Sequence, residues 1–167
     1  MGLAEVVTEK NLEDCYSVDM NDAVRHGMCV SILSSELASE LGMDDAFIHK
    51  VAVAGMLHDV GKPAALQATG CMYTHDALGA DIARGILERL RYPSGVIRDV
   101  TALIRNHMFD LRTEAKENTI RLWLQEMGIE RSRQLIALRR ADVHGSGRIE
   151  GPVESADRWE RILESMI

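Results

Sequence analysis

Apolar residues recur along this chain at spacings of three and four, which is the period of an amphipathic α-helix. The clearest examples are the segments 21–41 and 44–58. In the first segment one face carries positions 23, 26, 30, 33, 37 and 41, and Gly42 follows as a stop signal. In the second segment Asp44 is the predicted N-cap, and one face carries positions 47, 51, 54 and 58.

Similar patterns predict further helices over residues 74–91, 93–107, 114–127, 131–143 and 152–167. Thr74 is the expected N-cap of the first of these, while Pro93 and Pro152 suit the first turns of the second and the last. The segment 60–73 contains glycine and proline and is predicted to be a loop. No sustained alternation of apolar and polar residues indicates a strand. The pattern therefore predicts an all-α fold of about seven helices, with residues 1–167 forming a single domain.

The composition fits a globular protein with a sizeable core. The chain has 167 residues, of which 46% are apolar and 27% are charged, and this length can bury a core without disulfide support. Lys and Arg number 19 against 26 Asp and Glu, which gives a net charge of −7. An acidic balance of this kind argues against a surface dedicated to nucleic acid.

The cysteines and the N-terminus indicate a reducing compartment. Cys15, Cys29 and Cys71 are odd in number and form no C-x-x-C pair, so we expect free thiols, with Cys29 packed in the core. The first residues have neither the basic segment nor the apolar run of a signal peptide. No window approaches the roughly 20 apolar residues that a membrane span needs. The prediction is a cytoplasmic protein that does not enter a membrane.

Five of the predicted helices carry a histidine or aspartate on an otherwise apolar face. Helical spacing places His26 in the stripe 26-30-33-37, His58 at the end of 47-51-54-58, His75 at the start of 75-78-82-86, His107 at the end of 96-100-103-107, and Asp142 at the end of 135-138-142. Because unpartnered polar groups are costly to bury, this many inward imidazoles and carboxylates are most readily satisfied around a shared cation. Neutral imidazole and carboxylate suit Fe, Mn, Ni, Co or Zn. His49 and His144 fall outside the pattern and are expected in polar or peripheral positions.

The order of these residues resembles the HD-domain superfamily of metal-dependent phosphohydrolases. The series is His26, the His58-Asp59 pair, His75, His107 and Asp142. Four motifs are similar to those of the HD domain in bacterial tRNA nucleotidyltransferases: HDVGKP (58–63), HDALGA (75–80), RNHM (105–108) and ADVHG (141–145). The resemblance covers about residues 20–148. The Gly-rich loop and paired carboxylates of a nucleotidyltransferase head have no counterpart, so the chain resembles a stand-alone HD protein, and nucleotide addition is not implied.

The resemblance implies a site for one or two divalent metals, with Fe, Mn, Ni or Co expected and Mg or Zn as alternatives. His26, His58 and Asp142 would hold one metal, His75 and His107 would hold the second, and Asp59 would bridge them and act in catalysis. A metal-activated water would then attack a phosphoryl group. Lys62, expected in a flexible turn after Gly61, would neutralise phosphate oxygens. Four arginines near the ligands are further candidates for substrate binding: Arg25, Arg105, Arg139 and Arg140.

Three functions are compatible with this ligand set. The first is hydrolysis of a phosphoester in a nucleotide or related small phosphate, and it is the function we predict. The second is the chemistry of a superfamily branch of oxygenases that uses the same six ligands for a mixed-valence di-iron centre. Members of that branch tend to carry a lysine shortly after the fourth histidine, whereas Arg112 is the nearest cation after His107 here. The third is non-catalytic nucleotide binding. The sequence also leaves open whether the last helix, 153–167, packs within the chain or forms a homodimer.

Overall fold

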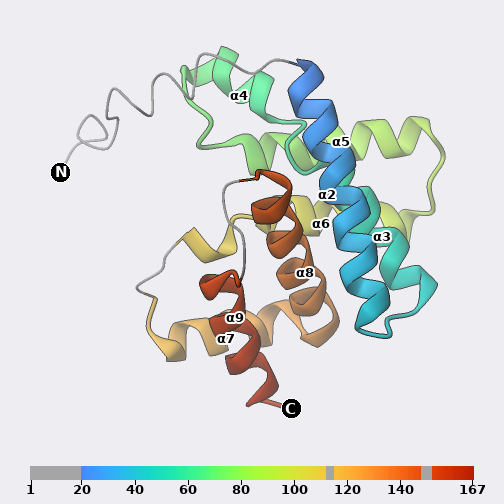
Figure 1. Ribbon diagram of the computed structural model, residues 1–167. Helices are drawn as coiled ribbons and strands as arrows, with labels where there is room; N and C mark the ends of the chain where they lie inside the picture. Colours follow the sequence, from blue (N-terminus) through green and yellow to red (C-terminus); the bar gives the residue numbers. More distant parts are fainter. Residues whose placement is uncertain (1–19, 112–114, 148–151) are drawn as a thin grey trace.

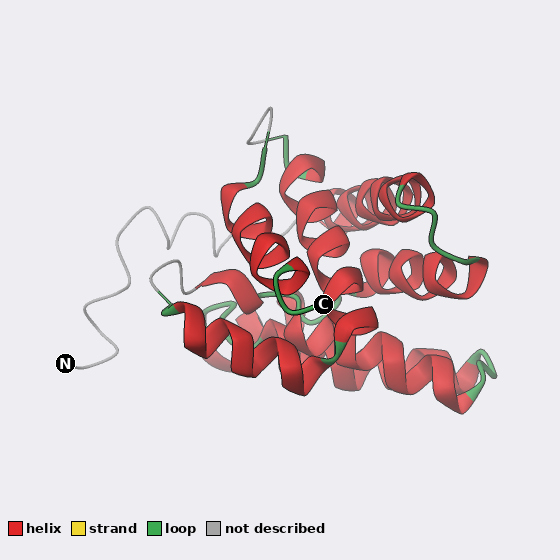
Figure 2. Cartoon of the chain, turned by 90° about the horizontal axis from the view of Figure 1, so that it is seen from below, coloured by secondary structure: helices red, strands yellow, loops and turns green. Residues whose placement is uncertain are grey.

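The computed structural model describes residues 20–111, 115–147 and 152–167, and the chain in these segments is built from helices (Figure 1). In chain order they are α2 (Met20–Glu40), α3 (Asp45–Leu57), α4 (Lys62–Thr69), α5 (His75–Arg89), α6 (Ser94–Asn106), the short 3-10 helix η2 (Phe109–Leu111), α7 (Glu117–Met127), α8 (Ile129–Gly145) and α9 (Glu154–Glu164). Figure 2 shows no strand among the described residues. The prediction of an all-α fold is confirmed, and each predicted helix is present. None of these helices is long and apolar enough to cross a membrane.

Helix α4 was not expected, because the sequence predicts a loop over 60–73. That prediction is wrong for the eight residues Lys62–Thr69. Pro63 lies in the first turn, where a missing N–H costs nothing, and Gly70 ends the helix in a left-handed conformation with φ of 71°. Lys62 is therefore the first residue of a helix and is not in a flexible turn.

Of the two predicted N-cap residues, one makes a capping hydrogen bond and the other does not. The side chain of Asp44 accepts a hydrogen bond from the Phe47 backbone nitrogen at 2.7 Å, which confirms it as the cap of α3. Thr74 occupies the N-cap position of α5, but its side chain makes no capping hydrogen bond.

Helix α8 lies between two clusters of buried apolar side chains. The larger cluster joins α8 to α2, α3 and α6, and its members include Val30, Val51, Leu103, Leu135 and Leu138. The smaller cluster joins α8 to α7 and α9, and its members include Ile120, Ile136, Trp159 and Leu163. Figure 1 shows α2 on one side of α8 and α9 on the other. Because α8 is packed from both sides, Asp142 near its C-terminal end has a fixed position relative to the rest of the bundle.

The buried face of α5 is displaced from the predicted stripe. Positions 78, 82 and 86 are only half-buried, whereas positions 79, 80, 83 and 87 are buried. The backbone of Gly61 closely approaches the start of α5 on this buried face. A methyl group on Gly61 would clash with the His75 carbonyl oxygen and would lie 2.5 Å from the Gly79 backbone nitrogen. A methyl group on Gly79 would lie 3.3 Å from the Gly61 backbone nitrogen, so the absence of a side chain at both glycines permits this contact.

Replacing Gly61 with alanine is expected to lower the free energy of unfolding by about 3 kcal/mol, because backbone atoms must move apart to admit the methyl group. Gly85 provides the matched control, since a methyl group there has no atom within 4 Å. Gly85→Ala should raise stability by up to about 1 kcal/mol through helix propensity. Urea denaturation measures both changes. A Gly61→Ala protein as stable as Gly85→Ala would contradict the backbone contact.

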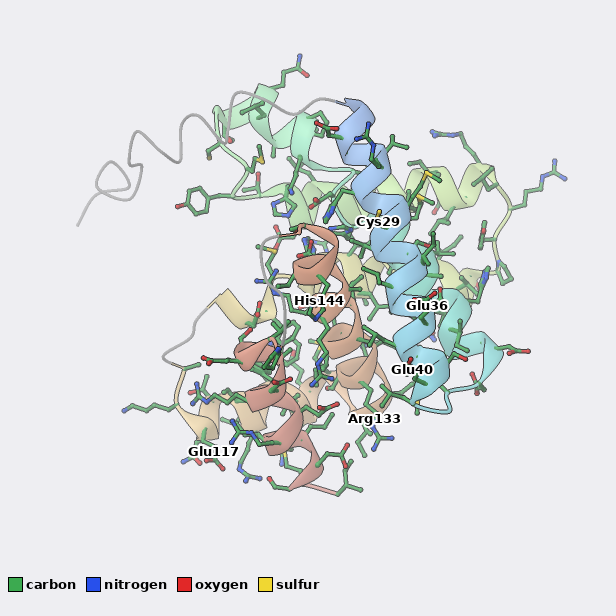
Figure 3. All side chains as sticks on the ribbon, viewed as in Figure 1. Cys29, Glu36, Glu40, Glu117, Arg133 and His144 are labelled. Atoms are coloured by element: carbon green, nitrogen blue, oxygen red, sulfur yellow. The ribbon has the colours of Figure 1, made fainter. Side chains whose placement is uncertain are left out.

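The prediction that Cys29 packs in the core is wrong, because Cys29 lies exposed on the outer side of α2 (Figure 3). Its neighbours Gly27 and Val30 face inward instead. Cys29 and Cys71 are free thiols, as expected. Three features of the sequence lie outside the described residues: Cys15, Arg112 and the N-terminal segment 1–19.

Candidate metal centre

Six side chains from five helices, or from the residues directly after them, meet at one place in the bundle. His26 lies on α2 and Asp142 on α8. His58 and Asp59 follow α3, His75 begins α5, and His107 follows α6. Their ligand atoms form two groups in which the atoms lie within 4.8 Å of one another. We call these the first triad (His26, His58 and Asp142) and the second triad (Asp59, His75 and His107). The structure thus brings together every residue for which the sequence predicts a ligand role.

Backbone carbonyls fix the orientation of three of the histidines. Nδ1 donates a hydrogen bond to the carbonyl oxygen three residues earlier: His58 to Gly55 at 2.8 Å, His75 to Met72 at 2.6 Å, and His107 to Ile104 at 2.6 Å. A carbonyl oxygen can only accept, so Nδ1 carries the proton in each ring. The acceptors of His58 and His107 belong to the last turns of α3 and α6, where carbonyls lack a partner within the helix. Because Nδ1 faces a carbonyl, Nε2 is the nitrogen that each ring turns toward the site.

The Nε2 atoms that point inward lie close together, and they lack the hydrogen-bond partners that buried nitrogen atoms normally have. Nε2 of His75 is 3.0 Å from Nε2 of His107, a distance at which two lone pairs repel unless a proton or a metal lies between them. Nε2 of His58 is buried and has no hydrogen-bond partner, although buried polar atoms are nearly always paired. Both observations fit a metal site lined by imidazole nitrogen.

The carboxylate of Asp59 faces both triads. Its Oδ2 lies 3.3 Å from Nε2 of His58 and 3.8 Å from Nε2 of His26. Its Oδ1 lies 3.5 Å from Nε2 of His75 and 4.0 Å from Nε2 of His107. One oxygen thus points to the histidines of each triad, which is the arrangement that a bridging carboxylate requires.

Asp142 is held by Arg139, one of the arginines predicted near the ligands, and Arg139 is held in turn by Asp110, which the sequence did not indicate. Oδ1 of Asp142 lies 3.0 Å from Nε2 of His26, and Oδ2 accepts a hydrogen bond from Arg139 at 2.8 Å. Arg139 also donates to Oδ2 of Asp110 at 2.8 Å. Asp110 is 3% exposed. The only sequence signal for Asp110 is its position three residues after His107, which does not indicate a role.

The carboxylates favour positive charge at this buried centre. Burial alone lowers the pKa of His58, but the adjacent Asp142 and Asp59 outweigh it and raise that pKa to about 10. Burial alone raises the pKa of both aspartates, but contacts with neighbouring groups lower it well below the usual range: His58 and Lys62 act on Asp59, and His26, His58 and Arg139 act on Asp142. Burial together with the charge on His58 lowers the pKa of His107 to about 4. The centre thus favours positive charge at His58 and disfavours it at His107, and a divalent metal would supply positive charge at the same place.

The triads open into a cavity of about 370 Å³ whose lining includes Lys62, Arg139, Met108 and Val143. Nζ of Lys62 lies 2.6 Å from Oδ2 of Asp59. The other three predicted arginines do not line this cavity. Each of them pairs elsewhere: Arg25 with Asp22 at 3.6 Å, Arg105 with Asp81 at 2.9 Å, and Arg140 with Asp157 at 2.7 Å and Glu160 at 2.6 Å. Of the predicted cations, Lys62 and Arg139 are the ones that the structure places beside the triads.

The two remaining histidines of the sequence lie outside both triads. His49 is exposed on α3, as expected, and stacks on Tyr92 with ring centroids 5.9 Å apart. His144 is half-buried near the C-terminal end of α8 (Figure 3).

The chain is thus a helical protein in which two groups of imidazole and carboxylate side chains face each other and form a candidate metal centre. Residues 24–144 match the HD domain, and the chain belongs to this family, which is part of the superfamily of metal-dependent phosphohydrolases. The matched range lies within residues 20–148, over which the sequence carries the resemblance. The resemblance recognised in the sequence is therefore confirmed.

Curated relatives share only a short segment with this chain. Ribonuclease Y from Mycoplasma mycoides is 41% identical over 63 residues, which cover 38% of this chain and 14% of the relative. Ribonuclease Y from Nitratidesulfovibrio vulgaris is also 41% identical over 63 residues, which cover 11% of that protein. The A-adding tRNA nucleotidyltransferase from Deinococcus radiodurans is 38% identical over 63 residues, which cover 35% of this chain and 14% of the relative. The chain therefore aligns with a small part of each of these longer proteins.

Proposed function

We propose that this protein is a phosphohydrolase that cleaves a phosphoester of a nucleotide or a related small phosphate at a dinuclear metal centre. The first triad would hold one metal, the second triad would hold the other, and the carboxylate of Asp59 would be shared between them. The observation that carries this proposal is the carboxylate of Asp59, which turns one oxygen toward the histidines of each triad at 3.3–4.0 Å. The nitrogen and oxygen donors suit Fe, Mn, Ni or Co, with Mg or Zn as alternatives.

The residues of the chain prepare the site for a phosphoryl group. When bound, a pair of divalent metals lowers the pKa of a nearby water and neutralises phosphoryl oxygens. Three histidines are held in one tautomer by backbone carbonyls, so their Nε2 atoms need no reorganisation to bind. Lys62 is anchored by Asp59 and stays 31% exposed in the cavity, where its ammonium group can contact a phosphate oxygen as charge develops.

A small substrate is favoured over a nucleic acid by the charge of the chain. Proteins that bind nucleic acid gain most of their affinity from lysine and arginine contacts with phosphates. This chain has a net charge of −7. The names of the ribonuclease relatives make an RNA phosphodiester the second candidate. The two candidates differ in whether a short oligoribonucleotide or a single nucleotide is cleaved at the higher kcat/KM.

A panel of phosphoesters tests the proposal. The protein loaded in turn with Mn, Ni, Co or Mg is incubated with nucleoside monophosphates, cyclic nucleotides, dinucleoside polyphosphates and a short RNA. We expect release of product from at least one of the small substrates, with Lys62→Met weakening turnover and the exposed Arg25→Met leaving it unchanged. Failure of every metal form on every substrate would contradict the proposed activity.

The same panel, repeated without oxygen, separates hydrolysis from oxygenase chemistry. Hydrolysis needs no change in oxidation state, so we expect equal rates in air and under argon. Product formation that requires oxygen would assign the centre to the oxygenase branch of the superfamily instead.

A further inference from the structure

Helix α9 (Glu154–Glu164) lies beyond residues 24–144, the part of the chain that matches the HD domain. Its apolar face is buried within the chain through Trp159, Ile162 and Leu163, which pack in the smaller cluster with α7 and α8. Figure 1 shows α9 beside α8, the helix that carries Asp142. An element outside the matched domain is thus packed directly against a helix of the candidate metal centre.

A continuous series of hydrogen bonds runs from α9 to the first triad. Ser155 in the first turn of α9 donates from Oγ to Oδ2 of Asp110 at 2.6 Å. The same Oδ2 accepts from Nε of Arg139 at 2.8 Å, and Nη1 of Arg139 donates to Oδ2 of Asp142 at 2.8 Å. Oδ1 of Asp142 is left to face His26 at 3.0 Å and His58 at 3.3 Å. The two oxygens of Asp142 are therefore divided, one for Arg139 and one for the triad.

The position of Asp110 determines how Arg139 can bind Asp142. Asp110 is buried, so its charge has to be balanced by Arg139. A planar guanidinium group readily binds both oxygens of a carboxylate at once. Here Nε is held by Asp110, so Arg139 reaches only one oxygen of Asp142. Without Asp110, Arg139 is free to bind both oxygens and to compete with a metal for Oδ1.

A second contact fixes α9 to the same turn of α8. Arg140, the residue after Arg139, donates from Nη2 to Asp157 at 2.7 Å and to Glu160 at 2.6 Å. Its Nη1 donates to the other oxygen of Glu160 at 3.1 Å. Neighbouring arginines of α8 thus face different partners: Arg140 holds α9, and Arg139 holds the metal ligand.

We infer that α9 helps to position a ligand of the metal centre. Ser155 and Asp110 act as positioning residues: together they orient Arg139, and Arg139 orients the carboxylate of Asp142. The inference rests on the proposed binding of metal by the first triad. It assigns a role to a helix that the HD domain match does not include. It also predicts that the contact between α9 and η2 affects the metal affinity of the first triad but not that of the second triad.

The test measures metal affinity in a background that keeps only the first site. In full-length His75→Ala/His107→Ala protein, Mn²⁺ and Co²⁺ titrations report the first triad alone, and the Co²⁺ absorption spectrum reports its geometry. We expect Asp110→Asn to weaken binding by about tenfold to a hundredfold, as loss of a residue that orients a ligand typically does. Ser155→Ala should weaken binding in the same direction and Ser155→Thr should restore it. Ser165→Ala removes a serine at the far end of α9 and should leave affinity and spectrum unchanged.

Thermal melts in excess chelator show whether each variant is folded. Unchanged affinity in folded Asp110→Asn and folded Ser155→Ala would overturn the inference. An equal loss of metal affinity at the second site, measured in a His26→Ala background, would also overturn the inference, because it would indicate a general loosening of the fold. If Asp110→Asn does not fold, the result with Ser155→Ala decides. These outcomes are distinct from failure of the proposed function: metal binding without product release counts against the activity, and absence of binding in the unaltered background counts against the metal centre.

Discussion

Asp59→Ala is expected to lower kcat by at least about a thousandfold, because the carboxylate is the only proposed ligand shared by both metals. One oxygen lies 3.3 Å from His58 and the other 3.5 Å from His75, so the substitution would remove a ligand from both proposed metals. Metal content should fall together with activity. Steady-state assays with the best substrate of the phosphoester panel, combined with metal analysis of the same samples, measure both effects.

His49→Ala is the matched control for this variant. His49 also belongs to α3, the helix that ends beside Asp59, but lies on its exposed side, where it stacks on Tyr92. Its loss should change neither kcat nor metal content. Similar losses in Asp59→Ala and His49→Ala would show that the inward face of α3 has been assigned wrongly.

Removal of metal is expected to lower the melting temperature by roughly 10 °C. A metal present at about a thousand times its dissociation constant contributes about 4 kcal/mol to stability, and each kcal/mol corresponds to roughly 2–4 °C in a chain of this length. The expected effect is large because metal ions at the triads would join five helices at once. A bound metal would also separate the lone pairs of the His75 and His107 Nε2 atoms, which lie 3.0 Å apart.

Differential scanning calorimetry before and after treatment with chelator measures this shift. Addition of metal should restore the original transition, and the chelator should have much less effect on Asp59→Ala protein. A transition that does not move after verified removal of metal would mean that the triads do not bind metal in the folded protein.

The helices and most of the candidate site could be predicted because both depend on local spacing. His58 and His107 end stripes that are buried in the structure, and helical periodicity alone places them inward. The eight-residue helix α4 was missed because it is too short to show a periodic pattern. Its Pro63 and Gly70, which suggested a loop, are instead a helix start and a helix end. The face of α5 was misplaced because it depends on tertiary contacts, such as the one between Gly61 and Gly79, which periodicity within α5 does not indicate.

The polar contacts that support the site could not be predicted, since they join residues far apart in sequence. Asp110 meets Arg139 across 29 positions and Ser155 across 45. Helical periodicity carries no information about such pairs. The same limit applies to the arginines: Arg139 and Arg140 are adjacent in sequence, yet one lines the cavity and the other binds α9.

The number of metal ions bound per chain tests the central claim most directly. The protein is loaded with Mn²⁺, freed of excess metal by gel filtration and analysed by mass spectrometry of the elements. A dinuclear centre predicts about two ions per chain in the intact protein and about one in the His75→Ala/His107→Ala variant. The buried imidazoles of His75 and His107, whose Nε2 atoms face each other at 3.0 Å, are the observation that supports the second site. A fully loaded wild-type protein that holds one ion per chain would contradict the dinuclear centre.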